Sequence, residues 1–190
     1  MSKTYRCHSG GAIGSDITWE NISNKYGIET IPYSFKNHKQ ESKVPYILSD
    51  EQLNEGFEQV KISAIKLNRN IQKVTSYVKK LLSRNWFQVK NSEGIYAIGT
   101  IKNEKEVDGG TGWAVQMGIN LKRTIFVFEQ NENLWYQYSY EKEKFIPLYD
   151  KIPKLTEEFA GIGTREINQN GISAIENILH YNVIGVLKQI

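Results

Sequence analysis

The chain has 190 residues, enough for one α/β domain with a substantial core, and its 39% hydrophobic and 24% charged residues exclude a disordered protein. The net charge of +3 without a strong basic block argues against a duplex-binding surface but is compatible with a small anionic ligand. The single cysteine, Cys7, excludes an internal disulfide, and no apolar run approaches the length of a membrane span. We therefore expect one soluble, cytoplasmic domain, with no membrane partner.

The N-terminal segment predicts a strand, a glycine turn and a helix. Thr4–His8 is a short strand, and the glycine-rich Ser9–Ser15 follows it directly. Asp16–Tyr26 then forms a helix, with Ile17 and Ile22 facing inward. A glycine turn between a strand and a helix is one place where an anion can be bound.

A second strand is predicted at Ile28–Tyr33, followed by a polar loop over Ser34–Pro45. The loop contains Phe35 and His38, which we regard as candidate ligand contacts because loops at strand ends in α/β sheets often bind ligands. A solvated surface loop explains this composition equally well.

The middle of the chain, about 49–91, predicts a helical insertion. Ser49 and Gln52 have the spacing of a capping box. A long helix is indicated by apolar residues at helical spacing: Leu53, Phe57, Val60, Ala64, Leu67 and Ile71. A further helix after a break is indicated by Val74, Val78, Leu81 and Leu82.

Arginines in this insertion are candidates for phosphate contact. Arg69 precedes an asparagine, and Arg84 with Asn85 precedes two aromatic residues. Arginine beside aromatics suits phosphate binding and base stacking. Any single arginine is nevertheless more often a surface or structural residue.

The most informative segment is Asp108–Met117 (DGGTGWAVQM), which lies between two predicted strands, Ile95–Gly99 and Thr124–Phe128. It predicts a glycine turn and then an apolar helix of about three turns. Its three glycines leave the N–H groups of the helix start open to an anion, and Thr111 adds a hydroxyl donor. A glycine turn that merely reverses the chain is the simpler alternative.

The C-terminal third predicts a small antiparallel β appendix at about 134–147, formed by Leu134–Tyr138 and Phe145–Ile146. A last strand, Phe159–Ile162, leads into a third glycine-containing segment, and a final helix spans about Gly171–Tyr181. Together the elements predict an α/β fold, a Rossmann-like parallel sheet flanked by helices, in a single domain over residues 1–190.

In their order and spacing, Ser9–Asp16 (SGGAIGSD), 109–117 (GGTGWAVQM) and 159–166 (FAGIGTRE) resemble the SLOG superfamily of Rossmann-like nucleotide-derivative binders. That superfamily includes the lonely-guy phosphoribohydrolases and DprA-like proteins. The Ser-Phe-Lys-x-His segment at 34–38 and the helical middle make small phage-type SLOG proteins the closer resemblance, over nearly the whole chain.

The chain departs from the lonely-guy pattern at its catalytic position. Laid onto that family's Pro-Gly-Gly-x-Gly-Thr-x-x-Glu motif, the threonine position is Trp113 and the glutamate position is Gln116. An amide can hydrogen-bond a ribose hydroxyl but cannot act as a general base. Only Glu166 or Asp16 is left to substitute for it.

The resemblance implies binding of a nucleotide derivative of the ADP-ribose class, linear, cyclic or base-modified, without catalysis. A phage protein of this kind would sequester an NADase-derived immune signal in the host cytoplasm. The alternatives are a nucleotide phosphoribohydrolase of the lonely-guy type and, less favoured because no basic stripe is present, a DprA-type DNA-handling protein.

For the binding hypothesis we expect a homo-oligomer that takes a small nucleotide ligand, with no nucleic-acid partner, no cofactor and no metal. His8, His38 and His180 lie far apart in the sequence, and no Cys cluster accompanies them. The expected ligand-binding residues are Ser9, Gly10, Gly11, Asp16, Phe35, His38, Arg69, Arg84, Asn85, Gly109, Gly110, Thr111, Gln116, Arg165 and Glu166.

Overall fold

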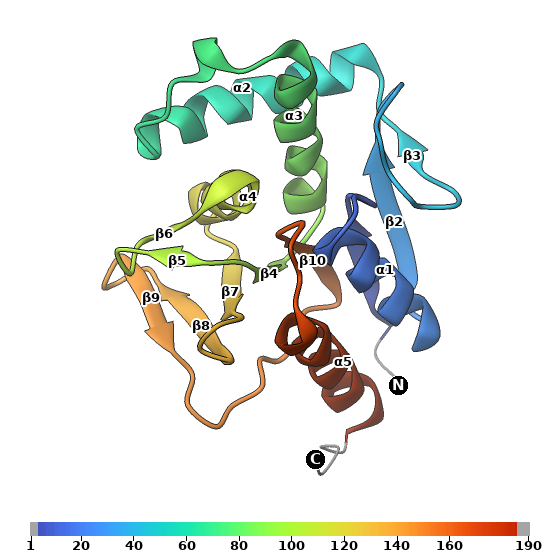
Figure 1. Cartoon of the computed structure of the whole chain (residues 1–190), viewed down its shortest axis with the longest axis vertical. Helices are drawn as coiled ribbons and strands as arrows, with labels where there is room; N and C mark the ends of the chain where they lie inside the picture. Colours follow the sequence, from blue (N-terminus) through green and yellow to red (C-terminus); the bar gives the residue numbers. More distant parts are fainter. Residues whose placement is uncertain (1–3, 186–190) are drawn as a thin grey trace.

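The computed structural model describes residues 4–185 and has an eight-stranded sheet at its centre (Figure 1). The strand order is β3-β2-β1-β10-β4-β7-β8-β9, in which neighbours are parallel from β3 to β7 and antiparallel from β7 to β9. The strands are β1 (Arg6–Ser9), β2 (Glu29–Ser34), β3 (Tyr46–Ile47), β4 (Gly94–Ile98), β7 (Thr124–Glu129), β8 (Leu134–Ser139), β9 (Lys144–Pro147) and β10 (Glu158–Gly163).

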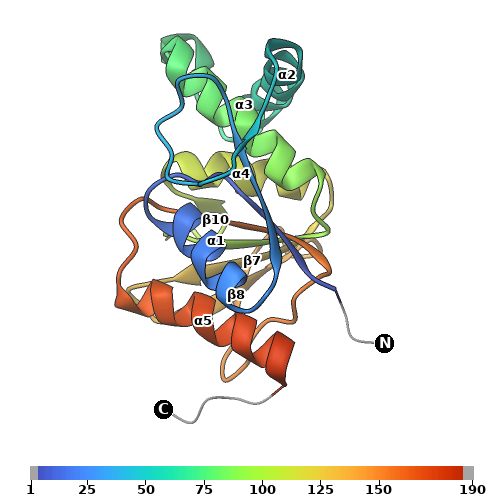
Figure 2. The ribbon, with the colours of Figure 1, turned by 90° about the vertical axis from the view of Figure 1, so that its right-hand side faces the viewer.

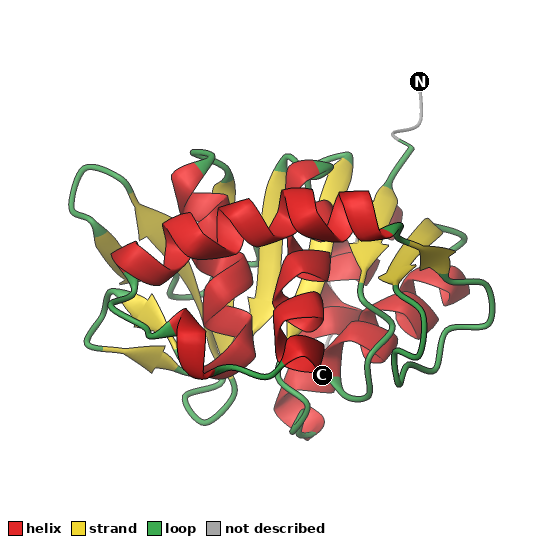
Figure 3. Ribbon diagram, turned by 90° about the horizontal axis from the view of Figure 1, so that it is seen from above, coloured by secondary structure: helices red, strands yellow, loops and turns green. Residues whose placement is uncertain are grey.

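Helices cover both faces of the sheet. Figure 2 shows α1 (Ser15–Lys25) and α5 (Gln169–Ile184) on one side of the strands, and α3 (Ser76–Lys90) and α4 (Gly109–Asn120) on the other. The long α2 (Asp50–Lys66) packs chiefly on α3 and α4, so it forms an outer layer that Figure 3 shows from above. The α/β class expected from the sequence is confirmed, with a mostly parallel sheet and a Rossmann-like arrangement.

Alternation along the central strands divides the core between the two faces. In β4, Ile95 and Ala97 belong to the cluster beneath α3 and α4, whereas Tyr96 and Ile98 belong to the cluster beneath α1 and α5. All five residues of this strand are buried, as expected for a parallel strand covered on both faces. The two cores hold the glycine turns at fixed positions relative to each other.

Most predicted elements occur within a few residues of their expected bounds. The capping box is present, because Ser49 Oγ accepts from the Gln52 N–H and the Gln52 side chain accepts from the Ser49 N–H. The sequence did not predict β3, nor the two-stranded antiparallel sheet of β5 (Ile101–Lys102) and β6 (Glu106–Val107). Two-residue strands are too short to show a hydrophobic period. A 3-10 turn, Ile71–Lys73, separates α2 from α3.

The predicted inward face of α1 is only partly right. Ile22 is partly buried and packs against the core, but Ile17 belongs to neither core cluster, and the completely buried residue of the helix is Trp19. The reason is a close approach between α1 and β10, where a Cβ at Gly161 would overlap the Trp19 ring. The buried face therefore combines one tryptophan with small and polar residues and has no aliphatic stripe.

Candidate functional site

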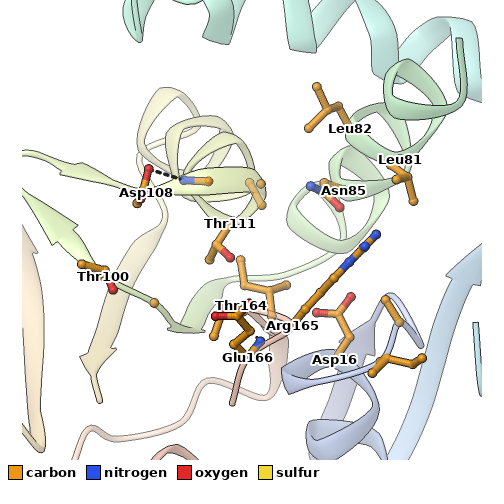
Figure 4. Close-up of a pocket in the computed structure, with 18 of the residues that line it drawn as sticks. Asp16, Leu81, Leu82, Asn85, Thr100, Asp108, Thr111, Thr164, Arg165 and Glu166 are labelled. Atoms are coloured by element: carbon orange, nitrogen blue, oxygen red, sulfur yellow. Dashed lines mark hydrogen bonds between the residues drawn. The ribbon is translucent and has the colours of Figure 1, made fainter. Parts of the chain in front are cut away.

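The sheet has a topological switch point at its centre. The chain leaves β1 through α1 to reach β2 on one side, and leaves β4 through α4 to reach β7 on the other, with β10 between β1 and β4. Crevices at the carboxyl ends of such strands are the usual ligand sites of open α/β sheets. A cavity of about 680 Å³ lies there (Figure 4).

The cavity brings together the second and third glycine segments, Ala12 and Ile13 of the first one, and parts of α1 and α3. Eight of the residues expected from the sequence line it: Asp16, Arg84, Asn85, Gly109, Gly110, Thr111, Arg165 and Glu166. The remaining expected residues do not line it: Ser9, Gly10, Gly11, Phe35, His38, Arg69 and Gln116.

The start of α4 presents bare backbone to this cavity. Asp108 caps the helix by accepting from the Gly109 N–H at 2.7 Å, and Lys102 Nζ lies 2.7 Å from the same carboxylate. Within the described chain, the N–H groups of Gly110 and Thr111 donate to no protein acceptor. A Cβ added at Gly109 or Gly110 would meet no atom within 4 Å, so both glycines face open space. These donors at the positive end of the helix dipole are suited to an anion.

Arg69 stabilises this turn through hydrogen bonds to its carbonyl oxygens. Its guanidinium donates to the carbonyl oxygens of Gly109 at 2.9 Å and Val107 at 3.3 Å, and it lies over the Trp113 ring at 5.4 Å. A Cβ at Gly112 would overlap the Val107 carbonyl oxygen, so that glycine is needed for close packing. Arg69 therefore positions the glycine turn, in place of the ligand contact that we expected.

Arg84 and Asp16 form an ion pair at the edge of the cavity. Nη1 of Arg84 lies 3.0 Å from Oδ2 of Asp16, and the two side chains are 6% and 9% exposed. Burial raises the pKa of Asp16, while the positive charge of Arg84 opposes that rise. A Cβ at Gly10 would overlap Arg84 Nη1, so Gly10 provides the space in which the guanidinium lies.

The glycine pair of the first turn, Gly10 and Gly11, is consequently covered by protein, whereas Ala12 and Ile13 line the cavity. Ser9 Oγ donates to the Asp16 carbonyl oxygen at 2.8 Å and accepts from the Gly11 N–H at 3.2 Å. A Cβ at Gly11 would overlap Ser42 Oγ, which itself donates to Glu20 at 2.5 Å. Internal contacts thus use the groups that the sequence suggested for a ligand.

Arg165 is a cavity cation that forms no ion pair within residues 4–185. It follows β10, its side chain is exposed, and it makes no hydrogen bond or ion pair with the described residues. Figure 4 shows its side chain extending past Asp16 toward α3, with Thr164 and Glu166 beside it. The backbone beneath is held in place, because the Ser15 N–H donates to the Thr164 carbonyl at 2.9 Å.

Phe35 and His38 lie close to the cavity without lining it. Their rings stack at 4.7 Å, and His38 Nδ1 is 3.0 Å from Ser34 Oγ. Burial, together with the positive charges of Arg84 and Arg165, lowers the pKa of His38 to about 4. His38 is therefore neutral at neutral pH and adds no positive charge beside the site.

Gln116 points away from the cavity. Its Nε2 donates to Asn120 Oδ1 at 2.9 Å, and Asn120 in turn donates to Ser63 Oγ on α2 at 3.3 Å. Helical spacing places Thr111 and Ala114 on the cavity side of α4 instead. The position aligned with the lonely-guy glutamate thus belongs to the contact between helices.

Several lining residues were not predicted. One face of α3 contributes Val78, Leu81, Leu82 and Gln88 in addition to the expected residues. The loops that follow β4, β7 and β10 contribute Thr100, Gln130, Asn131, Thr164 and Asn168. Their positions at strand ends could indicate that they line a site. Using this indication requires the strand order, which local sequence patterns do not provide.

The chain matches no protein-family model, no curated protein and no solved structure among those with which we compared it. Within residues 4–185, no group of three or more His, Cys, Asp or Glu side chains is arranged to hold a metal ion. None of the helices in that range is long and apolar enough to cross a membrane.

Proposed function

We propose that the protein binds a nucleotide derivative of the ADP-ribose class and releases it chemically unchanged. The observation that supports this most is the combination, in one cavity, of a bare helix start, an unpaired arginine and an apolar wall. The volume of about 680 Å³ lies within the range typical of small-molecule sites.

The phosphates of such a ligand fit the side of the cavity formed by α4 and the loop after β10. The N–H groups of Gly110 and Thr111 supply donors without competing side chains. Arg165 supplies a positive charge that makes no ion pair with the described residues, although it lies close enough to Asp16 to lower the pKa of that carboxyl. A pyrophosphate can accept charge-assisted hydrogen bonds from both sources.

The nucleoside part fits the side of the cavity formed by α3. Val78, Leu81 and Leu82 supply an aliphatic surface there, with Ala114 of α4 and Ile162 of β10. Burial of a planar base against aliphatic side chains is favourable because it removes apolar surface from water. The polar side of the cavity thus lies apart from its apolar side, as the phosphates of a nucleotide lie apart from its base.

Absence of catalysis is supported by how the cavity carboxylates are used. Asp16 is paired with Arg84, and Asp108 caps α4, where the hydrogen bonds from Lys102 and the Gly109 N–H lower its pKa. Glycoside hydrolysis usually requires two carboxyl groups, one of them able to donate a proton. A phosphoribohydrolase, the alternative function, would have to rely on Glu166 in an exposed loop.

We place this binding in a biological role through the resemblance to phage-type SLOG proteins. A protein that removes an ADP-ribose-type immune signal from solution would act as an anti-defence protein in the host cytoplasm. Sequestration requires tight binding without turnover, which is consistent with the occupied carboxylates.

The role of Arg165 can be tested by thermal denaturation with ADP-ribose. At about 100 times its dissociation constant, a ligand adds about 2.7 kcal/mol, which raises the melting temperature of a protein of this size by roughly 5–10 °C. We expect that rise for the wild type and little of it for Arg165→Gln. The melting temperature without ligand should be nearly equal, because Arg165 is exposed and makes no hydrogen bond or ion pair with the described residues.

The matched control is Lys61→Gln, which removes a surface cation on α2 that pairs with Glu58 at 2.7 Å and lies over the Phe57 ring at 5.3 Å. Its ligand response should equal that of the wild type. An undiminished response in Arg165→Gln would contradict the proposed phosphate site.

A further inference from the structure

Gln88 is a buried amide with no protein partner. Its side chain is 1% exposed, and neither Oε1 nor Nε2 makes a hydrogen bond with the described residues. Gln88 nevertheless lines the cavity. An unsatisfied donor and acceptor in a buried side chain are costly, so an apolar residue here would make a more stable protein.

Gln88 lies at the inner end of the α3 face that borders the cavity. Val78, Leu81, Asn85 and Gln88 follow one another at intervals of three and four, which places them in one stripe. The stripe is aliphatic at its first two positions and carries amides at its last two. Nε of Arg84, one turn before Gln88, is also buried without a partner. Unused polar groups therefore gather at the inner end of the wall that we assign to the nucleoside.

We propose that Gln88 selects adenine as the base of the ligand through paired hydrogen bonds. The inference rests on the proposed function and specifies its ligand. A carboxamide presents a donor and an acceptor side by side, and adenine matches them with its N6 amino group and the ring nitrogen N7. At the same edge hypoxanthine has a carbonyl oxygen in place of that amino group, so in this orientation it can accept from the amide nitrogen but has no donor for the amide oxygen.

The test compares the dissociation constants of ADP-ribose and of inosine diphosphate ribose, measured by calorimetry for the wild type, Gln88→Met and Gln116→Met. The wild type should bind ADP-ribose roughly 10- to 100-fold more tightly, as expected for a bidentate amide–base contact. Gln88→Met should lose most of that preference while melting at the same or a higher temperature, because it removes an unsatisfied amide. Gln116→Met, which alters an amide of α4 outside the cavity, should keep the preference.

The outcomes separate this inference from the proposed function. Equal binding of the two ligands by the wild type, or a preference that Gln88→Met retains, would overturn the assignment of Gln88 and leave ADP-ribose binding intact. Binding of neither ligand by the wild type would overturn the proposed function and this inference with it. The wild-type comparison requires no variant, so equal binding of the two ligands overturns the inference even if Gln88→Met fails to fold. A lower melting temperature of a folded Gln88→Met would indicate that the amide serves packing, against the proposal.

Discussion

Gly110→Leu should abolish binding of ADP-ribose and leave the fold intact. A side chain at this position enters open space at the start of α4 and covers the N–H groups of Gly110 and Thr111. Hydrogen bonds to a charged group contribute about 1.5–3 kcal/mol each, so loss of two corresponds to roughly 100-fold weaker binding or more. Calorimetry gives the affinity, and thermal denaturation without ligand reports the fold.

Gly112→Ala is the matched control, one helical position from the cavity lining. A Cβ there overlaps the Val107 carbonyl oxygen, so this small change should lower the melting temperature. Gly110→Leu should not lower it, because leucine is a better helix former than glycine and meets no neighbour at its Cβ. Unfolding of Gly110→Leu, or wild-type affinity in that variant, would contradict the assignment of Gly110 to the site.

Among the variants proposed here, Arg84→Met should lower the free energy of unfolding most. The substitution leaves the Asp16 carboxylate buried without its cation, and breaking a buried pair in this way typically costs about 3–5 kcal/mol of unfolding free energy. Urea denaturation measures the loss. By comparison, Lys61→Gln breaks an exposed pair and should change the unfolding free energy by less than about 1 kcal/mol.

The same variant should show a characteristic dependence on pH. Without Arg84, burial raises the pKa of Asp16 in the folded protein further above its value in the unfolded chain. The folded state then binds a proton that the unfolded state releases, so stability falls as the pH rises. The loss should therefore be greater at pH 8 than at pH 5, and the second substitution Asp16→Asn should reduce it. An equal loss at both pH values would indicate that Arg84 acts through packing alone.

The sequence predicted the site best where the relevant structure is local. The glycine-rich start of α4 and the strands before and after it, β4 and β7, all lie in one short stretch of the chain, from Gly94 to Glu129. The spacing of glycines after a strand and before an apolar helix therefore predicted both the helix and its open N–H groups. The helical insertion was predicted for the same reason, since periodicity and a capping box are local patterns.

Prediction failed where a distant side chain decides the outcome. Gly10 resembles a ligand-binding glycine, but Arg84, from another helix, occupies the space above it. Arg69 resembles a phosphate ligand, but its donors are used by carbonyl groups about forty residues away. Gln88 showed no local indication at all, because only the packing of α3 against the sheet reveals that its amide is buried and unpaired.

The central claim is that the protein binds an ADP-ribose-type molecule tightly and returns it unchanged. We would mix excess protein separately with linear and cyclic ADP-ribose, measure the free ligand, then denature the protein by heat and assay the supernatant by mass spectrometry. The account predicts that at least one of the two disappears from solution and is recovered intact after heating, and that Gly110→Leu depletes neither. Recovery of a hydrolysed product, or no depletion of either molecule by the wild type, would contradict it.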